Sequence, residues 1–428
     1  MALRYKDGPA MKPLFPILLA LSLLGLSGCG PASFSNQSVQ AKVLFSLEYG
    51  LQDRMLGLPE GRANELELYM REGIFHILDP TSKKILRTSS YGDLLSVIYD
   101  PVSSPSPSFE MPAGVFDESA SDALRGGRYA ARTSFVAPFS LGVDSSQLIY
   151  VADRLADPGM AIRDPLTGMY CDWIVRRFGK NGQELQFLGR EGLLGSAFAK
   201  IISIDCLSDD SIVVVSSSGS LHTVYRFSGD ARLLSSFAID SALLPVPLEL
   251  LDQDGGDPTT GKIHADLEGI FPMTSASGFA VILKINYYRE VGSPEASLSF
   301  GLDDSGSWIF SMDGKSGAQK LGFKLAPVES AGEEWELLGT YKEGFLLASP
   351  QARVQENAGN SDPQQTQPEE RRRLRLLDLS GKALYSAEIR LPRAKGLLKS
   401  LRLSSTGQVY GIFLGESEAK VLWWELPF

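Results

Sequence analysis

The sequence predicts an all-β fold, a β-propeller of six four-stranded blades in which an N-terminal strand closes the last blade. After Ser33 the chain consists of short runs that alternate apolar and polar residues between turn residues, with little helical periodicity. These runs pair into hairpins of two kinds. The two kinds alternate along the chain at intervals of roughly 45 to 90 residues, which is typical of propeller blades.

The first kind of hairpin is a strand, a polar turn containing Gly, and a second strand. It is clearest at residues 173–188 and 222–237, and weaker copies occur at 74–87, 307–323 and 374–389. The second kind precedes most of these copies, at residues 140–153, 202–215, 278–284, 341–347 and 401–413. Two hairpins in series make one four-stranded sheet. A pair of β-sandwiches or two smaller β domains would also alternate in polarity, but neither predicts two alternating hairpin types.

Residues 139–237 resemble NHL-type propeller repeats. The resemblance is carried by the run Asp-x-x-x-x-Ile-Tyr-Val-Ala-Asp from Asp144 to Asp153 and by the strand–Gly turn–strand at 173–188. It covers about a quarter of the chain, and the remainder follows the propeller pattern by periodicity alone. The resemblance implies the fold and binding through blade loops. It does not imply a particular activity.

The two ends of the chain predict how the ring closes. The last blade has a hairpin at 401–414 and a strand at 421–426, and the chain then stops one strand short. Residues 42–49 form a strand that has no blade of its own. We expect this strand to complete the last blade and so cover the open sheet edges. A seven-bladed ring stays an alternative, because residues 88–135 are not assigned to strands by their pattern.

The first residues resemble the signal peptide of a bacterial lipoprotein. Lys12 precedes an apolar run at 14–26, which ends in Leu-Ser-Gly-Cys with Cys29 last, as in a lipobox. The resemblance implies cleavage before Cys29 and acylation of its thiol, which anchors the chain stably because several acyl chains are attached. An ordinary signal peptide ending near a cysteine is the alternative. Gly30 is not the Asp that retains some lipoproteins at the inner membrane, so the outer membrane is favoured. Whether translation starts at Met1 or Met11 stays open.

The predicted organisation is therefore a signal peptide at 1–28, a lipidated flexible tether at 29–41 and a propeller domain at 42–428. Two stretches read as disordered loop insertions, near 101–130 and at 351–373, because they are rich in Ser, Pro, Gln and charged residues. Residues 153–172 form a further insertion. Blade loops are where propellers bind, so the insertions are candidate functional surfaces.

Composition narrows the classes of function. A net charge of -10 and a pI near 5.1 argue against a nucleic-acid partner. Three histidines leave few ligands for a His-rich metal site. Two cysteines besides Cys29 remain, Cys171 and Cys206. They form a disulfide in an oxidising compartment or are small buried apolar side chains.

The sequence offers few candidates for chemistry. Asp252, Asp254 and Asp257 have the short spacing of a calcium loop, with Asp266 and Glu268 downstream, but they lack the frame of an EF-hand, and an acidic solvated loop is the alternative. His264 could join Asp266 and Glu268 in a metal cluster or act as a general base. The Asp303-Asp304-Ser-Gly run is typical of a turn. Apart from calcium, no cofactor is expected.

The leading functional hypothesis is a lipid-anchored scaffold of the cell envelope that holds another envelope protein or a ligand on its loops. Which side of the membrane it faces is left open. The alternative is a propeller enzyme, such as a metal-dependent lactonase or a glycan lyase or hydrolase. Such enzymes place their acid, base or metal residues around the central channel. Asp144 and Asp205, near the inner strands of two blades, are the residues that this alternative singles out, although Asp there also caps turns.

Overall fold

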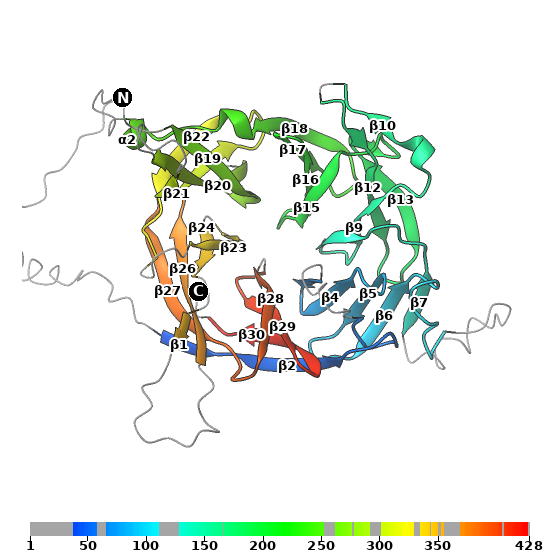
Figure 1. Cartoon of the computed structure of the whole chain (residues 1–428). Helices are drawn as coiled ribbons and strands as arrows, with labels where there is room; N and C mark the ends of the chain where they lie inside the picture. Colours follow the sequence, from blue (N-terminus) through cyan, green and yellow to red (C-terminus); the bar gives the residue numbers. More distant parts are fainter. Residues whose placement is uncertain are drawn as a thin grey trace, which may run out of the picture. The chain divides into compact units, whose positions relative to one another are not determined.

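A computed structural model describes residues 37–57, 66–110, 128–165, 167–251, 262–275, 278–291, 301–328, 334–342, 344–349, 352–354, 369–404 and 406–426. Six sheets follow one another around a central axis, as Figure 1 shows. The chain passes outward through each blade by antiparallel neighbours and then moves to the next blade. The predicted six-bladed propeller is thereby confirmed.

The first three blades carry the chain from residue 67 to residue 240. Their strands, from the axis outward, are as follows: β3 (Glu67–Arg71), β4 (Ile74–Asp79), β5 (Lys84–Thr88), β6 (Leu94–Tyr99) and β7 (Tyr129–Arg132) in blade one; β8 (Phe139–Val143), β9 (Ile149–Arg154), β12 (Trp173–Phe178), β13 (Glu184–Gly189) and β14 (Gly192–Leu193) in blade two; β15 (Lys200–Cys206), β16 (Ile212–Ser218), β17 (Leu221–Phe227) and β18 (Leu233–Asp240) in blade three. A small hairpin, β10 (Ile162–Arg163) and β11 (Tyr170–Cys171), lies in the insertion of blade two.

The remaining blades return the chain to its beginning. Their strands are as follows: β19 (Ile263–Ser275), β20 (Gly278–Val291), β21 (Gly301–Asp313) and β22 (Gln319–Lys324) in blade four; β23 (Glu336–Tyr341), β24 (Gly344–Ala348), β26 (Glu369–Asp378), β27 (Ala383–Arg390) and β1 (Gln37–Gln40) in blade five, with β25 (Ala352–Val354) beside β26; β28 (Gly396–Leu403), β29 (Val409–Gly415), β30 (Glu418–Trp424) and β2 (Lys42–Glu48) in blade six. None of the helices in the described part of the chain has the length and apolar character needed to cross a bilayer.

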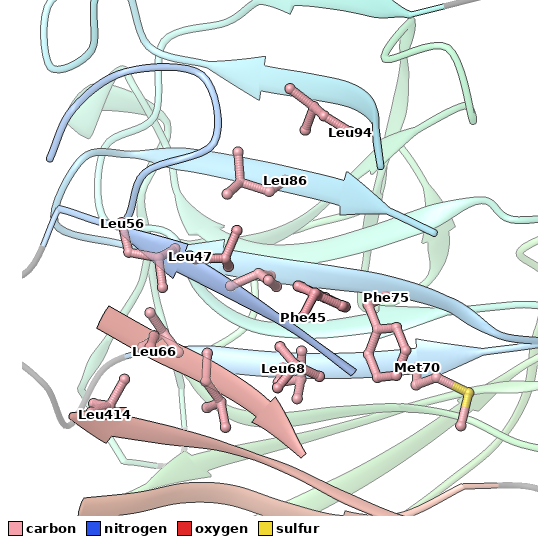
Figure 2. Close-up of a cluster of buried hydrophobic side chains, with 14 of the residues drawn as sticks. Phe45, Leu47, Leu56, Leu66, Leu68, Met70, Phe75, Leu86, Leu94 and Leu414 are labelled. Carbon is pink, nitrogen blue, oxygen red and sulfur yellow. The ribbon is translucent and has the colours of Figure 1, made fainter. Parts of the chain in front are cut away.

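The N-terminal strand closes the last blade as predicted. Strand β2 pairs antiparallel with β30, and its inward residues Phe45 and Leu47 are buried. Figure 2 shows them among side chains of blade one, where the rings of Phe45 and Phe75 meet edge to face at 5.7 Å. The alternation of apolar and polar residues in β2 therefore has a direct cause, because one face of the strand completes the interface between blades six and one.

The hydrophobic core is divided among the blade interfaces. A separate cluster of buried side chains lies between each pair of neighbouring blades, for example Leu141 and Phe178 between blades one and two, and Val215 and Val281 between blades three and four. Each sheet is therefore apolar on both faces. Because the apolar side chains pack between blades, the inner strands present their remaining side chains to the axis.

Several predicted boundaries need correction. The tether was expected to extend through residue 41, but Gln37–Gln40 form β1, which pairs parallel with β27. The polar sequence of β1 does not predict a strand, because the strand is held by backbone hydrogen bonds to the edge of the sheet. Residues 88–135 belong to blade one through β6 and β7, so the hairpin at 74–87 forms its second and third strands rather than an outer pair.

Two stretches predicted as loops contain strands. In the insertion at 351–373, residues 352–354 and 369–373 pair as β25 and β26, and residues 355–368 lie outside the described residues. Residues 101–110 and 128–130 of the other insertion are described, with β7 beginning at Tyr129, whereas 111–127 are outside. Asp303 and Asp304 pair with β20 within β21 instead of forming a turn, since long blade-four strands extend the ladder past them.

Candidate functional site in the central channel

A cavity of about 320 Å³ lies at the axis of the propeller. Its walls come from five inner strands, β3, β15, β19, β23 and β28. Together with Tyr410 of β29, these strands bring together residues that are up to 341 positions apart, from Tyr69 to Tyr410. The cavity is therefore a product of ring closure, and its polar side chains come from five blades, all but blade two.

Asp205 on β15 is a channel carboxylate whose ionisation is altered. Burial raises the pKa of its carboxyl from an ordinary value near 3.8 to about 6. Two charged neighbours act in opposite directions on this pKa: Arg402 lowers it and Glu67 raises it. Asp205 is consequently able to exchange a proton near neutral pH, which an exposed aspartate does not do.

Arg402 and Glu67 form an ion pair across the point where the ring closes. The Arg402 Nη2 atom on β28 lies 3.1 Å from the Glu67 Oε2 atom on β3. The same Glu67 oxygen accepts a hydrogen bond from the backbone N–H of Leu141 on β8, also at 3.1 Å. One carboxylate thus joins the inner strands of blades six, one and two, and both charges are compensated where they are partly buried.

Two tyrosines fix β3 against its neighbours. The Tyr69 hydroxyl donates to the carbonyl of Cys206 at 3.3 Å, and the Tyr410 hydroxyl accepts from the backbone N–H of Met70 at 3.1 Å. Burial raises the pKa of both phenols, so both stay neutral. They contribute hydrogen bonds and aromatic surface to the channel wall without adding charge.

A second ion pair joins three blades near the end of β3. Arg71 Nη2 lies 2.9 Å from Asp210 Oδ1, in the turn between β15 and β16. Asp210 also accepts from the backbone N–H of Ser145, in the turn between β8 and β9, at 2.9 Å. Arg71 is therefore paired within the chain, and the pair links blades one, two and three.

The two aspartates singled out by the enzyme alternative have different roles. Asp144 Oδ1 accepts from the backbone N–H of Leu148 at 2.9 Å, and its Oδ2 accepts from the Tyr150 hydroxyl at 3.0 Å. Asp144 is a turn cap, as Asp at this position of a repeat often is. Asp205 instead faces the cavity. The two residues differ in their place in the hairpin: Asp144 directly follows β8 and begins the turn, whereas Asp205 lies within β15 and pairs with Val213.

Cys171 and Cys206 are both free and both buried. Cys171 belongs to a small cluster beneath the insertion of blade two, and Cys206 belongs to the interface between blades two and three. The disulfide alternative is therefore wrong in this structure, and the two side chains pack as small apolar groups. Burial also raises the pKa of both thiols.

The other predicted ligands lie apart from the channel cavity or outside the described residues. Cys29, Asp252, Asp254 and Asp257 are outside the described residues. His264 pairs with Glu290 at 2.5 Å on the long strands of blade four. Within the described ranges, no three side chains of His, Cys, Asp or Glu lie together in a way that could hold a metal ion.

Sequence reasoning missed a buried lysine on blade four. Lys284 on β20 is fully buried; its Nζ contacts the Glu268 carboxylate and lies 3.6 Å from Glu334 Oε2. Asn286 donates to Glu268 at 3.1 Å beside them. Burial lowers the pKa of Lys284, which the carboxylate of Glu334 opposes. The signal was present, since Lys284 interrupts the apolar run at 279–285 of β20, but its partners come from β19 and from the segment before β23.

Comparisons with known proteins give only weak structural likenesses. No family model and no curated protein matches the sequence. Among solved structures, a DUF4221-family protein from Bacteroides vulgatus is 9% identical with a TM-score of 0.34, covering 91% of this chain and 99% of its own. BamB from Moraxella catarrhalis is 8% identical with a TM-score of 0.33, covering 90% and 99%. A glucose dehydrogenase is 11% identical with a TM-score of 0.36, covering 90% and 99%. At these scores the likeness carries no argument about activity.

Proposed function

We propose that this chain is a lipid-anchored binding scaffold of the cell envelope. The proposal is carried by the position of the Leu-Ser-Gly-Cys run relative to the propeller. Cys29 precedes Gln37, the first residue of β1, by only eight positions. Eight residues span at most about 29 Å when fully extended. An acylated Cys29 would hold the propeller next to the bilayer through a strand that belongs to the blades.

Ion pairs between neighbouring blades support the scaffold proposal. Glu67 pairs with Arg402, and Arg71 pairs with Asp210, so these four charged side chains join blades to one another. A rigid ring of blades that carries insertions on its edges is suited to presenting surfaces to another protein. The NHL-type resemblance of residues 139–237 is in keeping with this use. We propose the outer membrane as the site of the anchor.

One observation favours a second candidate, a propeller enzyme. Asp205 faces the channel cavity with a pKa raised to about 6, which suits a general acid or base near neutral pH. If Asp205 acts on a substrate, Asp205→Asn should abolish turnover while leaving the fold intact. The enzyme candidate requires that Asp205→Asn loses turnover of a small polar substrate. If the wild-type protein has no activity on lactones or glycans, the enzyme candidate is rejected and the scaffold proposal is retained.

Intact mass spectrometry and fractionation of three proteins test the scaffold proposal: wild type, Cys29→Ala and the matched control Cys171→Ala. We expect wild type and Cys171→Ala to be cleaved before residue 29, to carry acyl mass and to require detergent for extraction. Cys29→Ala should lack the acyl mass and leave the detergent fraction. Wild-type protein without acyl chains, or acylated protein that never co-purifies a stoichiometric envelope protein, contradicts the proposal.

A further inference from the structure

We propose that the outer edge of β18 is a strand-addition site, which binds an extended segment of another envelope protein. This inference rests on the proposed scaffold function and specifies where its partner docks. Strand β18 is the outermost strand of blade three, and its residues pair with β17 on one side. In the described chain no strand pairs along its other side.

The propeller covers the comparable edge of three other blades with an added fifth strand. Strand β7 pairs parallel with β6, β14 pairs antiparallel with β13, and β1 pairs parallel with β27. One of these, β1, comes from a segment more than 340 positions away in the sequence. The outer blade edges of this fold therefore accept added strands in either direction, and one of these strands comes from a distant chain segment. A partner strand would use the same backbone hydrogen bonding.

The open edges differ in how they are protected from pairing. Strand β22 has Lys320 and Lys324, and β2 begins with Lys42 and ends with Glu48. Charged residues of this kind discourage strand addition. In β18 the seven residues at 233–239, Leu-Leu-Ser-Ser-Phe-Ala-Ile, carry no charge. Among these three open edge strands, β18 of blade three therefore has the longest run of uncharged residues.

Exposed apolar side chains are concentrated in the chain segments that precede and follow this strand. Of the 21 large hydrophobic residues exposed in the described chain, 13 lie between residues 160 and 251, in the outer parts of blades two and three and the segment after β18. They include Leu194, Leu234, Leu243 and Leu248. A bridge between Gly192 and Arg232 places β14 next to the beginning of β18. Apolar surface concentrated in this way marks interaction sites on soluble domains.

A flexible partner segment fits this surface better than a second copy of the chain. Two rigid rims can meet only along one strand of eight residues, and such a contact buries far less than the roughly 1,200–2,000 Å² of stable interfaces. An extended segment can pair with β18 and also lie over the leucines beside it. Blade three is opposite blade six in the ring (Figure 1). The edge of β18 is therefore on the far side of the ring from β2, a strand close to Cys29 in the sequence.

Site-specific photo-crosslinking in cells that produce the lipidated full chain tests the site. Leu234, Ser236 and Ala238 are exposed on one face of β18, so each is replaced in turn by a benzophenone amino acid. We expect the three positions to crosslink to one partner segment at residues spaced two apart, because paired strands alternate their side chains with a period of two. A probe at Lys320 of β22 should not reach that segment.

A charged substitution on β18 should weaken binding of the partner segment, and a charged substitution elsewhere serves as its control. Ala238→Lys copies the protection seen in β22 and should reduce the crosslink yield from position 234 at least tenfold, whereas Val102→Lys, at a residue 92% exposed in blade one, should not change it. Crosslinks without a period of two, crosslinks to β18 of a second copy, or no crosslink overturn the site. If acylated protein still co-purifies its partner in that case, the scaffold function stands and the docking site is elsewhere.

Discussion

Arg402 contacts Glu67 across 3.1 Å and so joins the inner strand of the last blade to the inner strand of the first. This pair lies on the channel side of the closing interface, whereas Phe45 and Phe75 pack on its outer side. Ring closure therefore has a polar and an apolar component. The polar component also modifies the pKa of Asp205, which burial raises, because Arg402 lowers this pKa and Glu67 raises it.

Asp205 should make the stability of the protein depend on pH. Its carboxyl has a higher pKa in the folded chain, about 6, than in the unfolded chain, so the folded state binds more protons between about pH 4 and pH 6. The free energy of unfolding should fall as the pH rises through this window. Relative to Asp205→Asn, wild type should lose up to about 3 kcal/mol between pH 4 and pH 7, as measured by urea unfolding.

The neighbours of Asp205 supply the control for that measurement. Glu67→Gln removes a charge that raises the pKa of Asp205, so its titration followed by NMR should move to lower pH. Arg402→Gln removes a charge that lowers this pKa, so the titration should move to higher pH. A difference between wild type and Asp205→Asn that does not change with pH would show that the Asp205 carboxyl is solvated.

Closure by β2 should be measurable in stability. Phe45 is buried between blades six and one, so Phe45→Ala removes its contact with Phe75 and leaves a cavity. We expect a loss of about 3 kcal/mol in the free energy of unfolding. The control is Val43→Ala on the same strand, where the side chain is 48% exposed and the expected loss is below about 1 kcal/mol. Equal losses would mean that β2 does not complete the blade.

The two blade cysteines should both be reactive thiols after unfolding. Cys171 and Cys206 are free and buried, and burial raises the pKa of each, so alkylation of the folded protein should be slow. Unfolding without reductant should allow two labels to add to Cys29→Ala protein, as counted by intact mass. If no label is added until a reductant is present, the two cysteines are bridged.

Much of the architecture was predictable from local patterns. Alternating polarity identified the strands of the blade hairpins, and the surplus strand at 42–49 indicated how the ring closes, because one buried face imposes a period of two on any strand. The pattern was least informative where burial does not vary along a strand. Strand β1 is polar and is held by hydrogen bonds to β27, and the charged residues 369–373 continue β26, so neither stretch carries the signal of a strand.

The sequence by itself determined the fold class, the number of blades and the strand that closes the ring, since each depends on periodicity and order along one chain. Only the tertiary structure decided which side chains face the channel. Asp205 and Arg402 line the cavity from two blades, Glu67 pairs with Arg402 from a third, and no spacing relates the three. Likewise Asp144 directly follows β8 and caps a turn, whereas Asp205 lies within β15 and faces the cavity. The pKa of a group and the partners it finds depend on what the other blades place beside it.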